Sequence, residues 1–90
     1  MIKLRLFSSL RELAGRKEVE VEGDSLVIKE ALSRFAQRYG DKAKQILFDQ
    51  QGEVWASVLL LVNGEAAEHG PATKVKAGDV VSVLLPTAGG

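Results

Sequence analysis

The chain has 90 residues, of which 46% are hydrophobic and 27% charged, and its 12 basic side chains balance 12 acidic ones. This length fits one domain, and the balanced charge argues against a nucleic acid or an anionic membrane as partner. The absence of cysteine from the sequence excludes disulfides, thiolate metal ligands and nucleophilic thiols.

An N-terminal strand is predicted over MIKLRLF, residues 1–7, because apolar and polar side chains alternate along it. Its inward face carries Ile2, Leu4 and Leu6, whereas Phe7 falls on the opposite face. The pattern therefore predicts a strand with one buried face.

A short helical turn and a second strand are predicted next. SSLRELAG offers Ser8 or Ser9 as an N-cap and Gly15 as a stop. KEVEVEG then alternates, with Val19 and Val21 inward and glutamates outward. Charged outer residues of this kind are typical of an edge strand.

The main helix is predicted from Asp24 or Ser25 to Tyr39, with Gly40 in the position of a C-terminal cap. Its apolar residues recur at intervals of three and four. These residues are Ile28, Ala31, Leu32, Phe35 and Tyr39. A second, short helix is predicted over residues 41–48.

Three strands are predicted in the C-terminal half. A central strand over residues 58–62 is apolar on both faces, and Asn63-Gly64 predicts a two-residue turn into a short, weaker strand. The segment 68–79 is polar and turn-rich. It precedes a last alternating strand over residues 80–85.

This order of elements predicts an α+β fold in which one amphipathic helix covers one face of a sheet and leaves the other face open. Phe7 and Leu84 fall on the open face, together with either Leu59 and Leu61 or the alternate residues of their strand. Grouped exposed apolar residues indicate a protein interface if these strands are neighbours. The alternative is that they are scattered or covered by a loop.

The residues argue against an active site within this chain. His69 is the only histidine and lies in a turn, and the serines lack a nucleophile-elbow motif. No metal-ligand cluster and no glycine-rich phosphate loop is apparent. We therefore expect no metal and no stably bound cofactor.

The sequence also predicts a soluble, cytoplasmic protein with neither a membrane nor a nucleic acid as partner. The N-terminus shows no secretory signal pattern. The longest apolar run, Val58 to Val62, is far shorter than the roughly 20 residues that span a bilayer.

We expect a folded domain over residues 1–85 and a flexible tail over residues 86–90. Pro86 cannot donate a ladder hydrogen bond and so ends the last strand. The tail extends at most about 17 Å. Beyond the proline, its residues are small or lack side chains: Thr87, Ala88, Gly89 and Gly90. Such a tail is slim enough to enter a narrow channel and place its terminal carboxylate at another protein's active centre.

Four stretches carry a family resemblance: LFSSLRELAG at 6–15, VNGEAA at 62–67, KAGDVV at 76–81 and LLPTAGG at 84–90. With them, the chain resembles the ubiquitin-like β-grasp sulfur-carrier family. It is most similar to the small subunit of molybdopterin synthase and to archaeal ubiquitin-like small modifier proteins. The resemblance implies a mixed sheet of about five strands with one main helix packed on one face.

The resemblance implies a defined chemistry for Gly90. In this family an E1-like adenylyltransferase, which uses ATP and magnesium, adenylates the terminal carboxylate, because a free carboxylate is a poor electrophile. Sulfur from a persulfide then displaces AMP. In the leading interpretation, the Gly90 thiocarboxylate donates sulfur to a pterin precursor held by the molybdopterin synthase large subunit.

The resemblance also implies which residues contact partners. Phe7, Ala66 and Leu84 align with contact positions, and the tail enters the partner. The implied partner-binding residues are therefore Phe7, Ala66, Leu84, Pro86, Thr87, Ala88 and Gly89. The family pattern Phe-Pro-Pro-Val is replaced here by Leu-Leu-Pro-Thr at residues 84–87.

Three other functions remain open. Attack by a lysine on the activated Gly90 would make the chain a protein modifier, as the archaeal relatives imply. Sulfur delivery to thiamin or transfer RNA is ranked lower, because family members in those pathways are usually shorter. A β-grasp binding module with an incidental diglycine is the remaining alternative.

Overall fold

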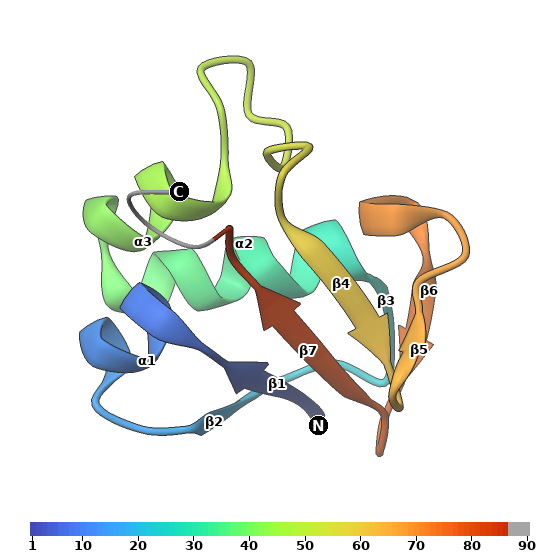
Figure 1. The fold of residues 1–90 in the computed structure, drawn as a ribbon. Coiled ribbons are helices and arrows are strands. Elements are labelled where there is room, and N and C mark those ends of the chain that lie inside the picture. The colour runs from blue at the N-terminus through green and yellow to red at the C-terminus, as the bar shows by residue number, and fades with distance from the viewer. Residues whose placement is uncertain (87–90) are drawn as a thin grey trace.

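In the computed structural model, which describes residues 1–86, five strands form one mixed sheet in the order β2-β1-β7-β4-β5 (Figure 1). The strands are β1 (Ile2–Leu6), β2 (Glu18–Val21), β4 (Leu59–Val62), β5 (Glu65–Ala66) and β7 (Val80–Leu84). β1 runs parallel to β7, and the other neighbours are antiparallel. The predicted mixed sheet of about five strands is confirmed.

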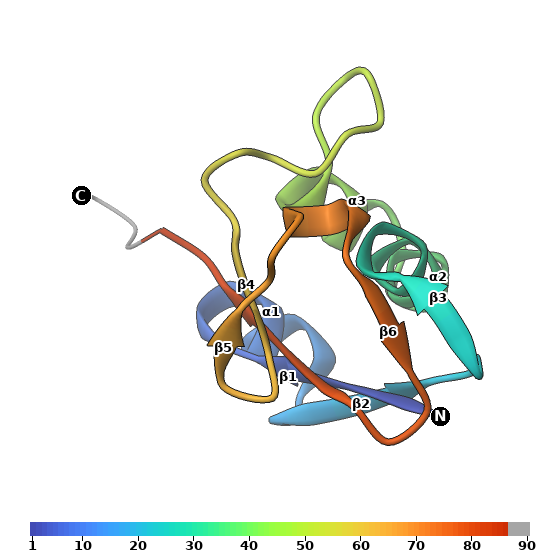
Figure 2. The ribbon, with the colours of Figure 1, turned by 90° about the vertical axis from the view of Figure 1, so that its right-hand side faces the viewer.

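Helices cover one face of this sheet. They are α1 (Ser8–Ala14), α2 (Ile28–Tyr39) and α3 (Asp41–Leu47), with a 3-10 turn, η1 (Gly70–Ala72). Figure 2 shows α2 and α3 together on one side of the strands. Within the described residues, none of the helices has the length and apolar character needed to cross a membrane.

The core forms between α2 and the inward residues of the strands. Phe35 on α2 is fully buried, as are Leu4 on β1 and Val83 on β7. Each large apolar side chain buried in this way contributes about 1.5–3 kcal/mol. The inward faces predicted for the first two strands are confirmed, since their inward residues are all buried. On the last strand the inward face predicted for Val81, Val83 and Leu85 holds for the first two, which are fully buried, whereas Leu85 lies beyond the end of β7 and is partly buried.

The start of the main helix was predicted wrongly. Residues Ser25–Val27 form a short strand, β3, and α2 begins only at Ile28. β3 pairs antiparallel with β6 (Lys74–Lys76), which lies in the segment predicted as turn-rich. The ladder partner is about fifty residues away in sequence, so no local pattern reveals this two-stranded sheet.

The N-cap predicted for the first helix is also wrong. Phe7, in an extended conformation, occupies the N-cap of α1, and no side chain caps the helix. α1 already begins at Ser8, which has φ 52°, one residue after the end of β1. The predicted stop is confirmed: Gly15 has φ 71°, and its N–H donates to the carbonyl of Arg11 at 2.9 Å.

The structure also shows the position of β4 in the sheet and the faces to which its side chains point. The strand predicted as central lies between β7 and β5, and β7 is the middle strand. Leu60 is buried against the core, whereas Leu59 is 53% exposed. Of the two facings that the sequence left open, the structure therefore places Leu59 and Leu61 on the open face.

Candidate functional site

An apolar patch occupies the open face of the sheet where β7 ends. Leu84 on β7 lies opposite Leu59 on β4, and Leu61 on β4 lies opposite Ala66 on β5. Directly opposed residues of antiparallel strands point to the same face. We call these four residues, together with Phe7, the open-face patch.

Phe7 joins the patch at the end of β1. Leu6 lies beside Val83 in the parallel pair, and Phe7 continues in an extended conformation, which turns its side chain to the face of Leu84. The Arg11 guanidinium carbon lies 5.4 Å from the centroid of the Phe7 ring, within cation–π range. Phe7 is half-buried, so its ring is partly available to a partner.

The other half of the open face is charged. Glu18 on β2 forms ion pairs with Lys3 at 3.6 Å and with Arg5 at 3.2 Å. Because exposed ion pairs are worth about 0–1 kcal/mol, these residues contribute little to stability. They form a polar border beside the open-face patch, as is usual around an apolar interface core.

A tight hairpin and a hydrogen-bond network hold β5 in place. Val62 pairs with Glu65, which confirms the predicted two-residue turn. The side chain of Asn63 accepts from the Val80 amide at 2.9 Å and donates to Asp79 at 3.1 Å. The backbone N–H of Lys76, followed by the Asn63 side chain, lowers the pKa of Asp79. The β4–β5 hairpin is thereby fixed against the start of β7.

The predicted site residues are partly brought together. Phe7, Ala66 and Leu84 share the open face, and Pro86 is exposed directly beyond the end of β7. Thr87, Ala88, Gly89 and Gly90 lie outside the described residues, so their roles stay predictions. Strand parity alone did not single out Ala66, although counting through the Asn63-Gly64 turn places it opposite Leu61.

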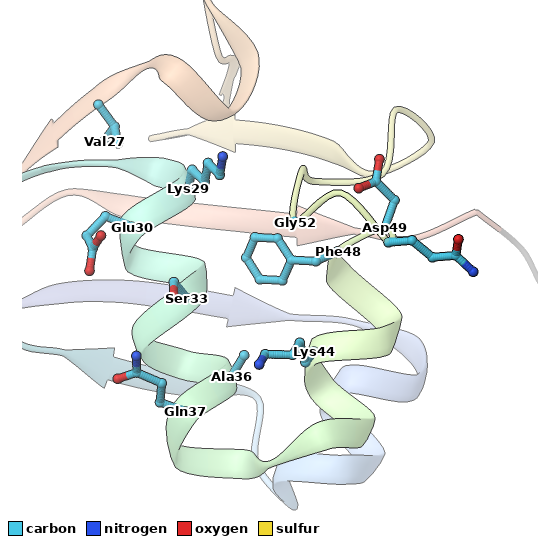
Figure 3. A pocket seen from close by; sticks show the side chains of 11 residues that line it. Val27, Lys29, Glu30, Ser33, Ala36, Gln37, Lys44, Phe48, Asp49 and Gly52 are labelled. Carbon is cyan, nitrogen blue, oxygen red and sulfur yellow. The ribbon is translucent and has the colours of Figure 1, made fainter.

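A separate hollow of about 660 Å³ lies between α2, α3 and the loop after α3 (Figure 3). Lys44, Phe48 and Asp49 are among its lining residues. Its charges are mixed, and Lys29 is already paired with Glu53 at 3.0 Å. Among the described residues, no group of three or more acidic or histidine side chains is placed to hold a metal ion. The hollow therefore offers no defined chemistry comparable to the open-face patch.

Comparison with known proteins shows the family. The ThiS family model matches residues 4–90. Small archaeal modifier protein 3 of Haloferax volcanii is 37% identical over 93 residues, which cover 99% of this chain and 98% of that protein. The crystal structure of SAMP1 from Haloferax volcanii has a TM-score of 0.79 at 30% identity and covers 99% of this chain and 98% of its own.

A third relative carries a different assignment. A Pyrococcus furiosus protein, a candidate molybdopterin converting factor, subunit 1, has a TM-score of 0.72 at 28% identity. The match covers 96% of this chain and 97% of that one. These similarities confirm the β-grasp fold. The chain belongs to the ThiS family of small ubiquitin-like proteins, which are sulfur carriers and modifiers rather than enzymes.

Proposed function

We propose that this chain is a ubiquitin-like carrier whose Gly90 carboxylate is activated by an E1-like adenylyltransferase. The observation that carries the proposal is the position of the open-face patch. Leu59 and Leu84 pair only two residues before Pro86, where the tail leaves the sheet. Residues 87–90 extend at most about 13 Å, so an enzyme that holds Gly90 lies against the surface around Pro86.

The proposed activation needs no catalytic side chain on this protein. A Gly90 carboxylate oxygen attacks the α-phosphorus of ATP, and pyrophosphate leaves. The acyl adenylate is then attacked at its carbonyl carbon, and AMP leaves with the bonding electrons. ATP and magnesium are bound by the enzyme, and we place the reaction in the cytoplasm.

In the leading proposal the terminal sulfur of an enzyme persulfide attacks the adenylate, and an acyl disulfide to Gly90 forms as AMP leaves. A second thiol of the enzyme then attacks the other sulfur of this disulfide. A new enzyme disulfide forms, and the Gly90 thiocarboxylate is released. A thiocarboxylate carries nucleophilic sulfur, which the chain delivers to a pterin precursor on a molybdopterin synthase large subunit. The membership in the ThiS family and the likeness to the Pyrococcus furiosus protein support this role.

The test is intact-mass spectrometry of the purified protein after incubation with ATP, magnesium, an E1-like adenylyltransferase, a persulfide donor and a thiol reductant. We expect one oxygen to be replaced by one sulfur at Gly90. The matched control is the chain that lacks Gly90, which should not change in mass. An unchanged wild-type mass, or the same change in the shortened chain, contradicts the proposal.

A second candidate function is protein modification, which the names of the Haloferax volcanii relatives favour. Here the amine of a target lysine attacks the adenylate, and an isopeptide bond to Gly90 forms. Cells that express a tagged chain should show high-mass conjugates, and a variant without Gly90 should show none. Absence of conjugates during growth that demands molybdenum cofactor favours the sulfur carrier.

A further inference from the structure

The loop after α3 presents an exposed tryptophan. Trp55 is 45% exposed, yet two hydrogen bonds hold it. Its backbone N–H donates to the carbonyl of Leu47 at 3.0 Å, and its indole N–H donates to the carbonyl of Gln45 at 3.1 Å. Both acceptors belong to the last turn of α3, where helical carbonyls lack partners within the helix. Trp55 therefore fastens the loop to α3.

The rest of the loop is also internally braced. Phe48 and Val54 form an isolated antiparallel bridge, and Val54 is buried. The Asp49 carboxylate accepts hydrogen bonds from the backbone N–H groups of Gln51 and Glu53, each at 2.9 Å. The position of the indole ring is thus set before any partner arrives, which reduces the entropic cost of burying it in an interface.

Trp55 lines a hollow of about 290 Å³ together with residues from the start of α1 and from just beyond the end of β7. Four other lining residues are apolar: Ile46, Val58, Leu85 and Pro86. The remaining lining residues are Ser9 and Ser57, which carry no charge. We call this hollow the Trp55 groove.

We propose that the Trp55 groove is a second docking surface for the E1-like adenylyltransferase and receives an apolar side chain of that enzyme. This inference rests on the proposed function. The position of the chain's end indicates that this enzyme occupies the groove. Pro86 lines the groove, and residues 87–90 reach at most about 13 Å beyond Pro86. An enzyme that encloses Gly90 therefore surrounds Pro86 and lies over the groove.

The groove and the open-face patch lie on opposite sides of the strand end. Leu84 points to the open face, whereas Leu85 follows the inward parity and packs against the core. An enzyme that contacts both surfaces therefore holds the chain near Pro86 from two sides.

Trp55 has the properties of an energetically dominant interface residue. Tryptophan is among the residues most often found at such positions. Its indole N–H is already bonded to the carbonyl of Gln45, so covering the ring leaves no unsatisfied donor. The lining carries no charged residue, so binding an apolar side chain requires no charge to be desolvated.

The experiment measures carrier-dependent ATP–pyrophosphate exchange by the E1-like adenylyltransferase of the source organism, with the full chain as substrate. Trp55→Ala should raise the KM for the carrier at least about tenfold with kcat little changed, because the lost contact is made outside the active centre. Ser57→Arg, which fills the groove from an exposed position, should do the same. Trp55→Phe, which keeps a ring, should have the smaller effect.

The control is Ser25→Arg, the same exchange at an exposed residue of β3, and it should keep the wild-type KM. If Trp55→Ala lowers the melting temperature, Ser57→Arg decides the result. Wild-type KM in both Trp55→Ala and Ser57→Arg overturns the inference and leaves the proposed function standing. No exchange with the wild-type chain contradicts the proposed function, and the inference falls with it.

Discussion

At the scale of single residues, Leu59 shows how this surface differs from an ordinary strand face. It is 53% exposed and lies opposite Leu84 on β7, at the end of β4 that β5 does not cover. An apolar side chain that stays this exposed adds little to the stability of the fold, because little of its surface is removed from water. A group of such side chains instead favours binding of another protein. The charged side chains of Lys3, Arg5 and Glu18 make the rest of the open face polar.

We predict that Ala66→Arg weakens binding to the E1-like adenylyltransferase at least about tenfold, because a charge is buried in an apolar interface. The matched control is Ala72→Arg, also at an exposed alanine but in η1, which packs beside α2. Isothermal titration calorimetry gives both dissociation constants. Equal affinity of the two variants would show that the open-face patch is not the docking surface.

Asp79 gives a prediction about pH. Its pKa is lowered by the backbone N–H of Lys76 and the side chain of Asn63, so the folded-state value lies below the unfolded one. The ionised carboxylate therefore stabilises the fold above a pH of about 4, and this contribution is lost as the pH falls through the folded-state pKa. We expect Asp79→Asn to show a shallower fall in melting temperature than wild type between about pH 5 and pH 2. Parallel curves for the two proteins would exclude the effect.

At the scale of elements, the main difference between expectation and structure is the β3–β6 sheet. Residues 25–27 precede a helical pattern and offer a serine, so they resemble a helix start. In the fold, Leu26 instead lies opposite Val75, and the Ile28 amide donates to the carbonyl of Thr73 at 2.9 Å. Pairing with a distant segment satisfies this backbone, which local propensity cannot anticipate.

We predict that Gly23→Ala destabilises the fold more than Gly15→Ala. Both glycines have positive φ, which costs an alanine about 1–2 kcal/mol. At Gly23 the added Cβ would also lie 2.6 Å from Cδ1 of Leu26, whereas nothing lies within 4 Å at Gly15. Leu26 is partly buried and packs against the core, so moving its side chain away loses part of that contact. Urea unfolding measures the free energy of unfolding of each variant. An equal loss in the two would mean that β3 shifts to accommodate the added Cβ at position 23.

At the scale of the whole molecule, the proposal separates two roles. The folded domain provides the binding surfaces, and Gly90 provides the carboxylate that reacts. The core is complete within the described residues, and β7 ends at Leu84, before Pro86. The described residues supply surfaces on either side of this strand end, and the chemistry is assigned to Gly90. Stability and proposed activity should therefore be separable.

We predict that a chain ending at Pro86 keeps the wild-type melting temperature to within about 2 °C, since chain ends outside the core tolerate change. The same chain should give no ATP–pyrophosphate exchange, because the carboxylate to be activated is no longer at Gly90. Differential scanning calorimetry and the exchange assay check the two halves of the prediction. A large loss of melting temperature would show that the last residues belong to the folded domain.

The sequence by itself determined the α+β class, the inward faces of β1 and β2 and the buried stripe of α2. It did so because alternation in strands and the intervals of three and four in helices are local properties of the chain. The Asn63-Gly64 turn was equally readable, since a two-residue hairpin sets its own register.

Only the tertiary structure decided which residues share a surface. The order β2-β1-β7-β4-β5 brings Phe7 beside Leu84 and turns Leu59, not Leu60, outward. The fold also places Trp55 in one hollow with Leu85 and Pro86, although sequence patterns assign Trp55 no role. These placements depend on hydrogen-bonded pairs between segments far apart in sequence, and their register is set by packing of the whole core.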